Sequence, residues 1–469
     1  MPMLGNWEGW GICLLACSSV VLSEVPRTNA LSEAASPSVE TRSAQNYPQE
    51  DADPLEPMET MDTASPDIVS DSDEARPMDI DLRYWPRWKR ATGDWMGVRP
   101  FLEDHGFTLE ASYEADYFYN LRGGLNTSNA GAYTGLFILA LTVDTAKADL
   151  WEGGTFFLNF QEIHGRDISA RHVGDLQGLN SNASDPRTQL AEYWYQHSLF
   201  EDRLRFKLGK MDANADFGVV EYALEFINSS AGLKPIMPIP QYPDPAMGAA
   251  VLVEPFDWVY AAAGVFDANA KGSRTGFDTA FHGPNHSVTL FETGLRPSFT
   301  LGQQVLPGTY RVGGWYHSGE WEVIPRSRFD WRSRTRRGNA GLYGSADQLV
   351  YRENPDVEDD TQGLGVFLKF GWAPSAYNEI SQFYGFGGQY TGLIPTRDAD
   401  VTGLGVFHAH LSGRIQSLES RHSETAIELF HKVQLTPFFS IKPDVQYIVN
   451  PDGDGRDAIV AGVRLEMIF

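Results

Sequence analysis

The chain has 469 residues, a formal net charge of −25 and a mean hydropathy of −0.31. Its negative charge argues against binding to nucleic acid, whose phosphates require a basic surface. Beyond the leader, no run approaches the roughly 20 consecutive apolar residues of a membrane helix, which argues against a helical membrane protein. A transmembrane β-barrel agrees with these values. Its strands alternate apolar and polar residues, so their mean hydropathy is close to zero.

Residues 1–30 are predicted to form a leader. The apolar run Trp10–Leu22 is too short to span a bilayer and has the length of a secretory signal, so we expect it to be removed. Residues 14–17 also resemble a lipoprotein processing box, and the alternative is that Cys17 becomes a lipidated N-terminus. Cys13 and Cys17 are the only cysteines, so the folded part is expected to lack disulfides and thiolate metal sites.

Residues 31–82 form an acidic segment with fourteen carboxylates against Arg42 and Arg76, which accounts for about half of the net charge. The segment is rich in Pro and Ser and has almost no aromatic residues. It cannot bury enough apolar surface to offset chain entropy, so we predict a disordered periplasmic arm. An anchoring role in the envelope is the alternative for this arm.

Residues 83–106 are predicted to be a periplasmic segment with a short helix. Asp94, Trp95 and Arg99 lie there, just before the first strand. Two interpretations stay open. Either Arg99 enters the pore as a constriction arginine, or Asp94 caps the helix while Trp95 anchors it by packing.

From residue 107 the periodicity becomes two. Between Phe107 and Tyr117 every odd position is apolar and every even position is polar, as in a strand with two different faces. Aromatic residues gather at the strand ends, which favours a membrane setting. The alternation predicts sixteen strands within 107–469, an even number that places both ends of the barrel sequence at one side. Their expected spans are 107–119, 133–144, 154–162, 189–200, 203–211, 247–256, 258–266, 288–299, 309–321, 341–351, 362–372, 380–391, 400–411, 424–436, 438–449 and 457–469.

Several motifs resemble those of the carbohydrate-selective porins of the OprB type. They are residues 92–99, 133–136, 174–178, 208–210, 226–230, 313–319, 390–395, 434–437 and 442–451. Their order spans about residues 91–469. The resemblance implies a 16-stranded antiparallel outer-membrane barrel that passes glucose and other small neutral sugars by diffusion. Met96 stands where the family more often has a second glycine.

A barrel of sixteen strands leaves a water-filled channel, so its narrowest ring decides which solutes pass. A neutral sugar needs hydrogen-bonding side chains and aromatic faces that release it again. The long segments 163–188 and 212–245 are expected to lie at the outer end, where they can fold inward. The candidate pore residues on these two segments are Arg171, Asp175, Gln177, Asp212, Asn214 and Glu221. The strand candidates with an expected inward face are Glu110, Glu114, Asp116, Arg203, Arg205 and Lys207. For each loop candidate the competing interpretation is a solvated or cap-forming loop residue.

Other patterns carry weaker predictions. Residues 325–337 contain six arginines in an outer loop, which either bind lipopolysaccharide phosphates or are simply solvated. His408 and His410 share a strand face without a third metal ligand, and residues 452–455 suggest a turn rather than a calcium loop. No cofactor is expected. Phe469 ends the last strand with the aromatic residue that resembles the signal for the barrel-assembly machinery.

Three functions therefore compete. The first is a passive sugar channel in the outer membrane, for which the sequence leaves open whether it is a monomer or an oligomer. The second is a structural barrel whose acidic arm anchors the envelope. The third is a barrel-borne lipid hydrolase, although the sequence lacks the Gly-x-Ser-x-Gly pattern of serine hydrolases.

Overall fold

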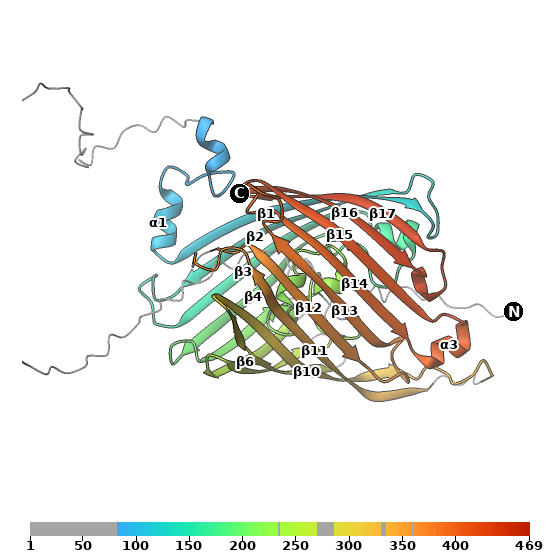
Figure 1. The fold of residues 1–469 in the computed structure, drawn as a ribbon. Coiled ribbons are helices and arrows are strands. Elements are labelled where there is room, and N and C mark those ends of the chain that lie inside the picture. The colour runs from blue at the N-terminus through green and yellow to red at the C-terminus, as the bar shows by residue number, and fades with distance from the viewer. Residues whose placement is uncertain (1–81, 233–234, 270–285, 330–333, 358–359) are drawn as a thin grey trace, which may run out of the picture. The chain divides into compact units, whose positions relative to one another are not determined.

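The structure is a computed structural model that describes residues 82–232, 235–269, 286–329, 334–357 and 360–469. The predicted leader and the acidic arm up to residue 81 lie outside the described residues. The described chain consists mainly of antiparallel strands, with short helical turns at their ends (Figure 1).

The strands follow the predicted alternation closely in position and number. They are β1 (Phe107–Arg122), β2 (Gly131–Asp144), β3 (Gly154–Gly165), β4 (Arg187–Leu199), β5 (Leu204–Met211), β6 (Ala246–Phe256), β7 (Val259–Asp267), β8 (Ser287–Leu295), β9 (Ser298–Leu301), β10 (Gln304–Glu322), β11 (Thr335–Arg352), β12 (Gly363–Trp372), β13 (Ile380–Thr391), β14 (Val401–Leu411), β15 (Ser423–Thr436), β16 (Phe439–Val449) and β17 (Ala458–Ile468).

The helical elements are short. They are η1 (Leu82–Arg87), α1 (Val98–Asp104), η2 (Ser169–Val173), η3 (Ala213–Ala215), η4 (Glu221–Ala223), α2 (Ser229–Gly232), α3 (Gly413–Glu419) and η5 (Pro451–Gly453). Among the described residues no helix combines the length and the apolar character needed to cross a membrane.

Sixteen strands close into one barrel, as predicted. Each strand pairs antiparallel with the next along the chain, β8 pairs directly with β10, and β17 pairs with β1. The remaining strand, β9, pairs only with the first residues of β10 and forms a small hairpin beyond the wall. The predicted strand 288–299 is therefore wrong at its end. It stops at Leu295, because Pro297 has no backbone N–H for the ladder.

The wall has two chemically different faces. On β1 the inward Asp116 is buried, whereas its outward neighbour Tyr117 is half exposed. The outward face carries one or more exposed apolar residues on most strands, and together they form an apolar belt. Examples around the barrel are Leu139, Phe160, Leu208, Phe291, Val312, Leu342, Leu368, Phe386, Leu404, Leu429, Val445 and Leu465. Closure removes exposed strand edges, so a belt of this kind meets lipid without leaving backbone groups unpaired.

The barrel has two distinct ends. We call the end where β1 begins and β17 finishes the terminal end, and the opposite end the loop end. At the terminal end the ring of Trp85 lies 4.8 Å from that of Phe438, and the backbone N–H of Ala91 donates to the carbonyl of Ile468 at 2.8 Å. The segment before β1 therefore packs on the seam between the first and last strands, where α1 lies near the C-terminus in Figure 1.

Candidate functional site

Two long connections at the loop end turn into the barrel. We call residues 166–186, between β3 and β4, the first inner segment, and residues 212–245, between β5 and β6, the second inner segment. Their contacts reach strands far along the chain. Gln177 of the first segment contacts Glu424, and Asn228 of the second contacts Gln446. Both segments therefore lie against the inward face of the barrel and narrow its channel (Figure 1).

Two glutamates of β15 hold the inner segments by their main chain. Glu424 accepts the N–H groups of Leu176 and Gln177 at 2.7 and 3.0 Å. Glu428 accepts those of Ile227 and Asn228 at 2.6 and 2.9 Å. Both carboxylates are fully buried, so these bonds replace the water that the groups lose. Each inner segment is thus pinned to the wall at a defined point.

The sequence candidates Glu114 and Asp116 belong to a buried ion cluster. Arg464 of β17 donates to both oxygens of Asp116 at 2.7 and 2.9 Å and lies 3.3 Å from Glu114. The side-chain amide of Asn182, from the first inner segment, donates to both carboxylates. Asp116 is 1% exposed and Glu114 is 8% exposed. Their hydrogen bonds and ion pairs therefore hold the first inner segment against the wall.

A second buried cluster joins the other inner segment to the wall. Glu225 pairs with Lys442 at 2.7 Å and with Lys432 at 3.0 Å, and Glu466 pairs with the same two lysines at 2.9 Å each. Burial raises the pKa of Glu225, but Lys442 and Lys432 together outweigh it, so the net shift is downward. The charges of the cluster compensate one another.

An aromatic contact completes the docking of the second inner segment. The ring of Phe226 meets those of Phe367, Phe407 and Phe430 edge to face, with centroids 5.6, 5.8 and 4.9 Å apart. A side chain on Gly403 would collide with Phe430 and Phe226. The glycine therefore makes room on β14 for this apolar anchor. We call the inward faces of β1, β12 and β14–β17, which carry these contacts, the docked wall.

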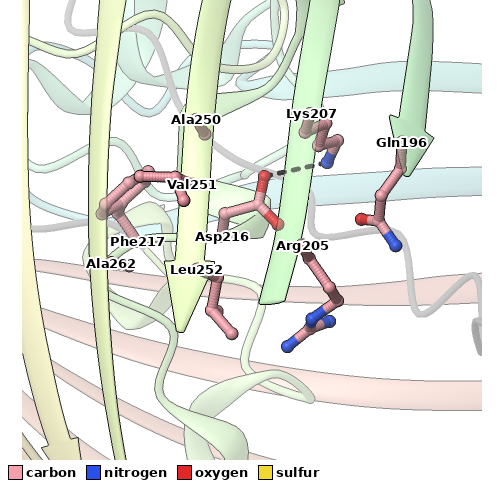
Figure 2. A pocket seen from close by; sticks show the side chains of 9 residues that line it. All are labelled: Gln196, Arg205, Lys207, Asp216, Phe217, Ala250, Val251, Leu252 and Ala262. Atoms are coloured by element: carbon pink, nitrogen blue, oxygen red, sulfur yellow. Dashed lines mark hydrogen bonds and ion pairs between the residues drawn. The ribbon is translucent and has the colours of Figure 1, made fainter. Parts of the chain in front are cut away.

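The inward faces of β3–β6 are different, and we call them the open wall. A recess there is lined by residues of β4 to β7 together with Asp216 and Phe217, and its empty volume is about 300 Å³ (Figure 2). The side chain of Arg205 is 33% exposed and that of Asp216 is 29% exposed. Arg205 and Asp216 are therefore partly exposed here, although other inward polar side chains of these strands, such as Gln189, Lys207 and Lys210, are buried.

Charges on the open wall occur in pairs. The ammonium of Lys207 lies 2.8 Å from Asp216, as Figure 2 shows, and 4.2 Å from the centroid of the Trp194 ring. Nearer the terminal end, Glu254 accepts from Arg205 at 2.7 Å and from Arg296 at 2.8 Å. These groups offer hydrogen-bond donors and acceptors while their opposite charges offset one another.

A third pair lies between the two walls. Arg311 of β10 bonds to the buried Asp347 at 2.6 Å and to Glu221 of η4 at 2.7 Å. The side chain of Glu221 is 55% exposed, so it remains accessible despite this pairing. Contact of the predicted pore candidate Glu221 with solute remains a prediction.

The remaining candidates on the inner segments have local bonding roles. Gln177 is 1% exposed and its oxygen accepts from the hydroxyl of Ser230, which ties the two inner segments together. Asp212 accepts the backbone N–H groups of Asn214 and Tyr242 at 2.7 and 2.9 Å. The side chain of Asn214 donates to the carbonyl of Phe217 at 2.7 Å. These three residues shape the segments, and contact with solute remains a prediction for them.

Two acids of the inner segments have shifted acidity. Burial raises the pKa of Asp175 to about 6, and the carboxylate of Asp167 adds to the effect. Burial also raises the pKa of Asp212 to about 7, with a further contribution from Glu192. Arg171 lies in η2 at the loop end with an exposed side chain, and its carbonyl accepts from Asn126 at 3.0 Å.

The three candidates before β1 lie at the terminal end. The guanidinium of Arg99 donates to the carbonyls of Gly93 at 2.8 Å and Phe469 at 3.2 Å. It also lies 4.1 Å from the centroid of the Trp95 ring. Arg99 is 4% exposed, so its bonds serve to hold this segment against the C-terminus.

The predicted cap at Asp94 is wrong. Gly97 occupies the N-cap of α1 and no side chain caps the helix. Asp94 instead accepts the backbone N–H of Met96 at 3.1 Å. Trp95, Met96 and Gly97 all have positive φ, so the chain turns through three left-handed residues before the helix begins.

Of the two other strand candidates, one lies on a strand and one lies in a turn. Glu110 is directed inward near the terminal end, 3.9 Å from Arg90. Arg203 lies in the turn before β5 and pairs with Asp257 at 3.2 Å, with 46% of its side chain exposed. Arg203 is therefore not on an inward strand face as expected, because β5 begins one residue later.

Three residues of these charge pairs escaped the sequence analysis. Asp216 follows a buried turn, Arg296 lies after the end of β8, and Glu254 belongs to a strand whose two faces are both mainly apolar. None of the three stands in a clear alternating pattern. The alternation of β10 would have identified Arg311, which shares its inward face with Trp315.

Among the described residues no group of three or more His, Cys, Asp or Glu is arranged to hold a metal ion. His408 and His410 lie on the outward face of β14, with ring centroids 6.4 Å apart. The hydroxyl of Thr425 lies 2.8 Å from Nδ1 of His408. In the 452–455 turn, Asp452 pairs with Arg421.

Comparisons with known proteins agree with this architecture. Residues 128–469 match the family model described as carbohydrate-selective porin, OprB family. The chain is 24% identical to Porin B of Pseudomonas aeruginosa over 428 residues, covering 82% of this chain and 92% of that protein. It is 23% identical to the putative porin QuiX of Acinetobacter baylyi over 417 residues, with coverage of 80% and 92%. The high-pH structure of Pseudomonas putida OprB superimposes with a TM-score of 0.75 at 23% identity, over 82% of this chain and 99% of that one.

Proposed function

Because this chain belongs to the OprB family of carbohydrate-selective porins, we propose that it passes small neutral sugars of the glucose type through its barrel by diffusion. The protein is an outer-membrane channel and not an enzyme, so the lipid-hydrolase alternative is set aside. In the proposed orientation the loop end faces the medium and the terminal end faces the periplasm.

The pairing of charges on the open wall carries the proposal. Lys207 with Asp216, and Glu254 with two arginines, present many donors and acceptors beside open space. Because each charge has a nearby partner of opposite sign, the electrostatic field in the channel is weak and does not favour ions of either charge. A neutral polyhydroxylated solute can still form hydrogen bonds with these groups. Each such contact is weak, which allows release at the far side.

The docked wall supports the same proposal by narrowing the channel. Both inner segments are pinned to β15, and we expect solutes to pass on the side of the recess lined by β4–β7. A sugar there also meets the aromatic pair Phe157 and Trp194, whose rings stack at 4.9 Å. Aromatic faces suit the C–H faces of pyranose rings.

Liposome swelling tests the proposed solute class. Liposomes that contain the full chain should swell faster in glucose than in gluconate or glucosamine, which have similar size but a net charge. Glucose should also reduce ion current in planar bilayers. Equal swelling rates for all three solutes would overturn the proposed preference for neutral sugars.

The structural-barrel alternative predicts a different result. Deleting the arm 31–82 should then weaken the envelope while sugar flux stays unchanged. Under the proposed function the same deletion should change neither property, because the charge pairs proposed to meet the solute lie within residues 205–296.

We also propose that Phe469 engages the assembly machinery before the barrel closes. In the closed barrel its N–H donates to Ala111 and its carbonyl accepts from Arg99, so its main chain is occupied. Deleting Phe469 should lower the amount of assembled barrel in the outer membrane, whereas Met467→Leu should not. An unchanged amount after the deletion would contradict this role.

A further inference from the structure

The structure contains a second recess, on the outside of the barrel at the loop end. It is lined by Trp372, residues 373–376, Ser381, Gln382, His410 and Gly413, and its empty volume is about 790 Å³. Trp372 pairs in register with Gln382, and Gln382 pairs with His410. These three side chains therefore form a row across the outward faces of β12–β14, on the side away from the channel.

On the side that faces the terminal end of the barrel, the recess adjoins the apolar belt. Along β12, Leu368, Phe370 and Trp372 alternate outward and are 60%, 40% and 41% exposed. On β13, Phe386 and Tyr384 follow the same face toward Gln382. An acyl chain that lies along the belt thus reaches the recess without leaving an apolar surface.

On the side that faces away from the terminal end, arginines lie near the recess. The guanidinium of Arg414 donates to the carbonyl of Ile324 at 2.6 Å, and the N–H of Ile324 donates to Ala376 at 2.9 Å. Arg328 donates from Nε to the carbonyl of Leu418 at 2.7 Å. These bonds hold the connection after β10 against α3 and against the residues that line the recess.

We call Arg326, Arg328 and Arg414 the basic rim. Arg326 and Arg328 are exposed, and Arg414 is half-buried beside Gly413 of the recess. Among the described residues of the neighbouring connections, Glu379 and Glu419 pair with Arg421 at 2.7 and 2.8 Å rather than with this rim. A positive edge therefore remains on a protein whose net charge is −25.

We propose that the recess and the basic rim bind one phosphorylated lipid of the outer leaflet. Its acyl chains would lie on the apolar belt near Phe370 and its headgroup would fill the recess beside Trp372. Its phosphate would bond to the basic rim, since guanidinium groups match phosphate geometry. This site goes beyond the proposed transport function and uses residues on the opposite face of the wall.

Lipid titration of the full chain in dodecyl maltoside micelles, followed by native mass spectrometry, tests the site. Bisphosphorylated lipid A should bind at least tenfold more tightly than enzymatically dephosphorylated lipid A. The double variant Arg326→Ala/Arg328→Ala should weaken binding of the bisphosphorylated form about tenfold or more, because each arginine near an anionic headgroup contributes appreciably. Pyrophosphate at equal concentration should not displace the lipid.

A second variant tests the recess itself. A Cβ at Gly413 would meet no atom within 4 Å, so Gly413→Phe is expected to fold and to obstruct the space. It should weaken both forms of lipid A. The matched control Arg122→Ala/Arg456→Ala removes two arginines from the same end on the β1–β17 side and should bind like the unmodified protein.

Three results would overturn the proposal. They are equal binding of the two lipid A forms, unchanged binding by the basic-rim variant, and equal loss in the control variant. Displacement by pyrophosphate would show a site for free phosphate compounds rather than a lipid site. Glucose flux through the basic-rim variant should stay unchanged, so failure of this proposal is separable from failure of the transport function.

Discussion

The docked wall and the open wall use the same residue types for different purposes. On the docked wall, Arg464 and its two acidic partners are nearly inaccessible and hold an inner segment in place. On the open wall, Arg205 lines the recess of Figure 2 and pairs with Glu254 at 2.7 Å, and their side chains remain 33% and 17% exposed. Burial therefore separates structural charge pairs from those that a solute can meet.

This difference has an energetic counterpart. A buried charge whose partner is removed keeps its desolvation cost, whereas an exposed one is stabilised again by water. Single substitutions on the docked wall should therefore lower the stability of the protein. Single substitutions on the open wall should instead change the selectivity of the channel. Four measurements can sharpen or break that comparison.

The largest effect is expected for Arg464→Ala. The substitution leaves Asp116 and Glu114 buried without their cation, which should lower the free energy of unfolding by roughly 3–5 kcal/mol. Urea-driven unfolding in lipid vesicles measures this change. Arg205→Ala on the open wall is the matched control and should cost less than about 1 kcal/mol. Equal losses for the two variants would remove the distinction between the walls.

Glu428→Ala should release the second inner segment from β15. It removes the acceptor of the Ile227 and Asn228 N–H groups, at a local cost on the order of 2–4 kcal/mol. Amide exchange of residues 225–231 should become faster, and single-channel conductance should rise. Glu254→Ala should leave this exchange unchanged. Intact protection in the Glu428 variant would mean that the aromatic contacts of Phe226 suffice for docking.

Lys207→Met should alter the ion selectivity of the open wall. Asp216 would then lack its partner, and the reversal potential in a salt gradient should shift toward cation preference. The double variant Lys207→Met/Asp216→Asn should return the potential toward that of the unmodified protein. If the double variant keeps the full shift in reversal potential, the unpaired carboxylate of Asp216 is not the cause of that shift.

The smallest effect concerns pH and Asp175. Its pKa is raised to about 6 by burial, so the docked state favours the protonated acid. The stabilising contribution is complete below the ordinary value near 4 and is lost as pH rises through about 6. Amide protection factors of residues 174–182 should therefore fall more between pH 4.5 and 7.5 in the unmodified protein than in Asp175→Asn. Asp185→Asn, at an exposed position, is the control. Identical profiles for the unmodified protein and Asp175→Asn would exclude this contribution.

The fold was largely predictable from local patterns. The alternation from Phe107 to Tyr117, and its recurrence fifteen times, located every strand of the barrel wall within several residues. The error at residues 296–299 arose because apolar residues continue through Pro297 into β9. In this segment the outward positions remain apolar although the hydrogen bonding of β8 to its neighbouring strands has already ended.

The candidate pore was only partly predictable. Alternation placed Lys207 and Arg205 inward, in agreement with the burial pattern of β5 and with the lining of the recess. It placed Glu114 and Asp116 inward equally well, but these two are buried under the first inner segment. A one-dimensional pattern assigns a side chain to a face and carries no information about what covers that face.

By itself the sequence determined the sixteen-stranded wall, its inward and outward faces, and the family to which the chain belongs. These properties depend on periodicity and on short motifs, which neighbouring residues specify. Only the tertiary structure decided which inward charges meet the channel, because that depends on two segments bonded to strands more than 200 residues away, as Ile227 is to Glu428. Contacts over such separations arise from closure of the barrel, and no local pattern encodes them.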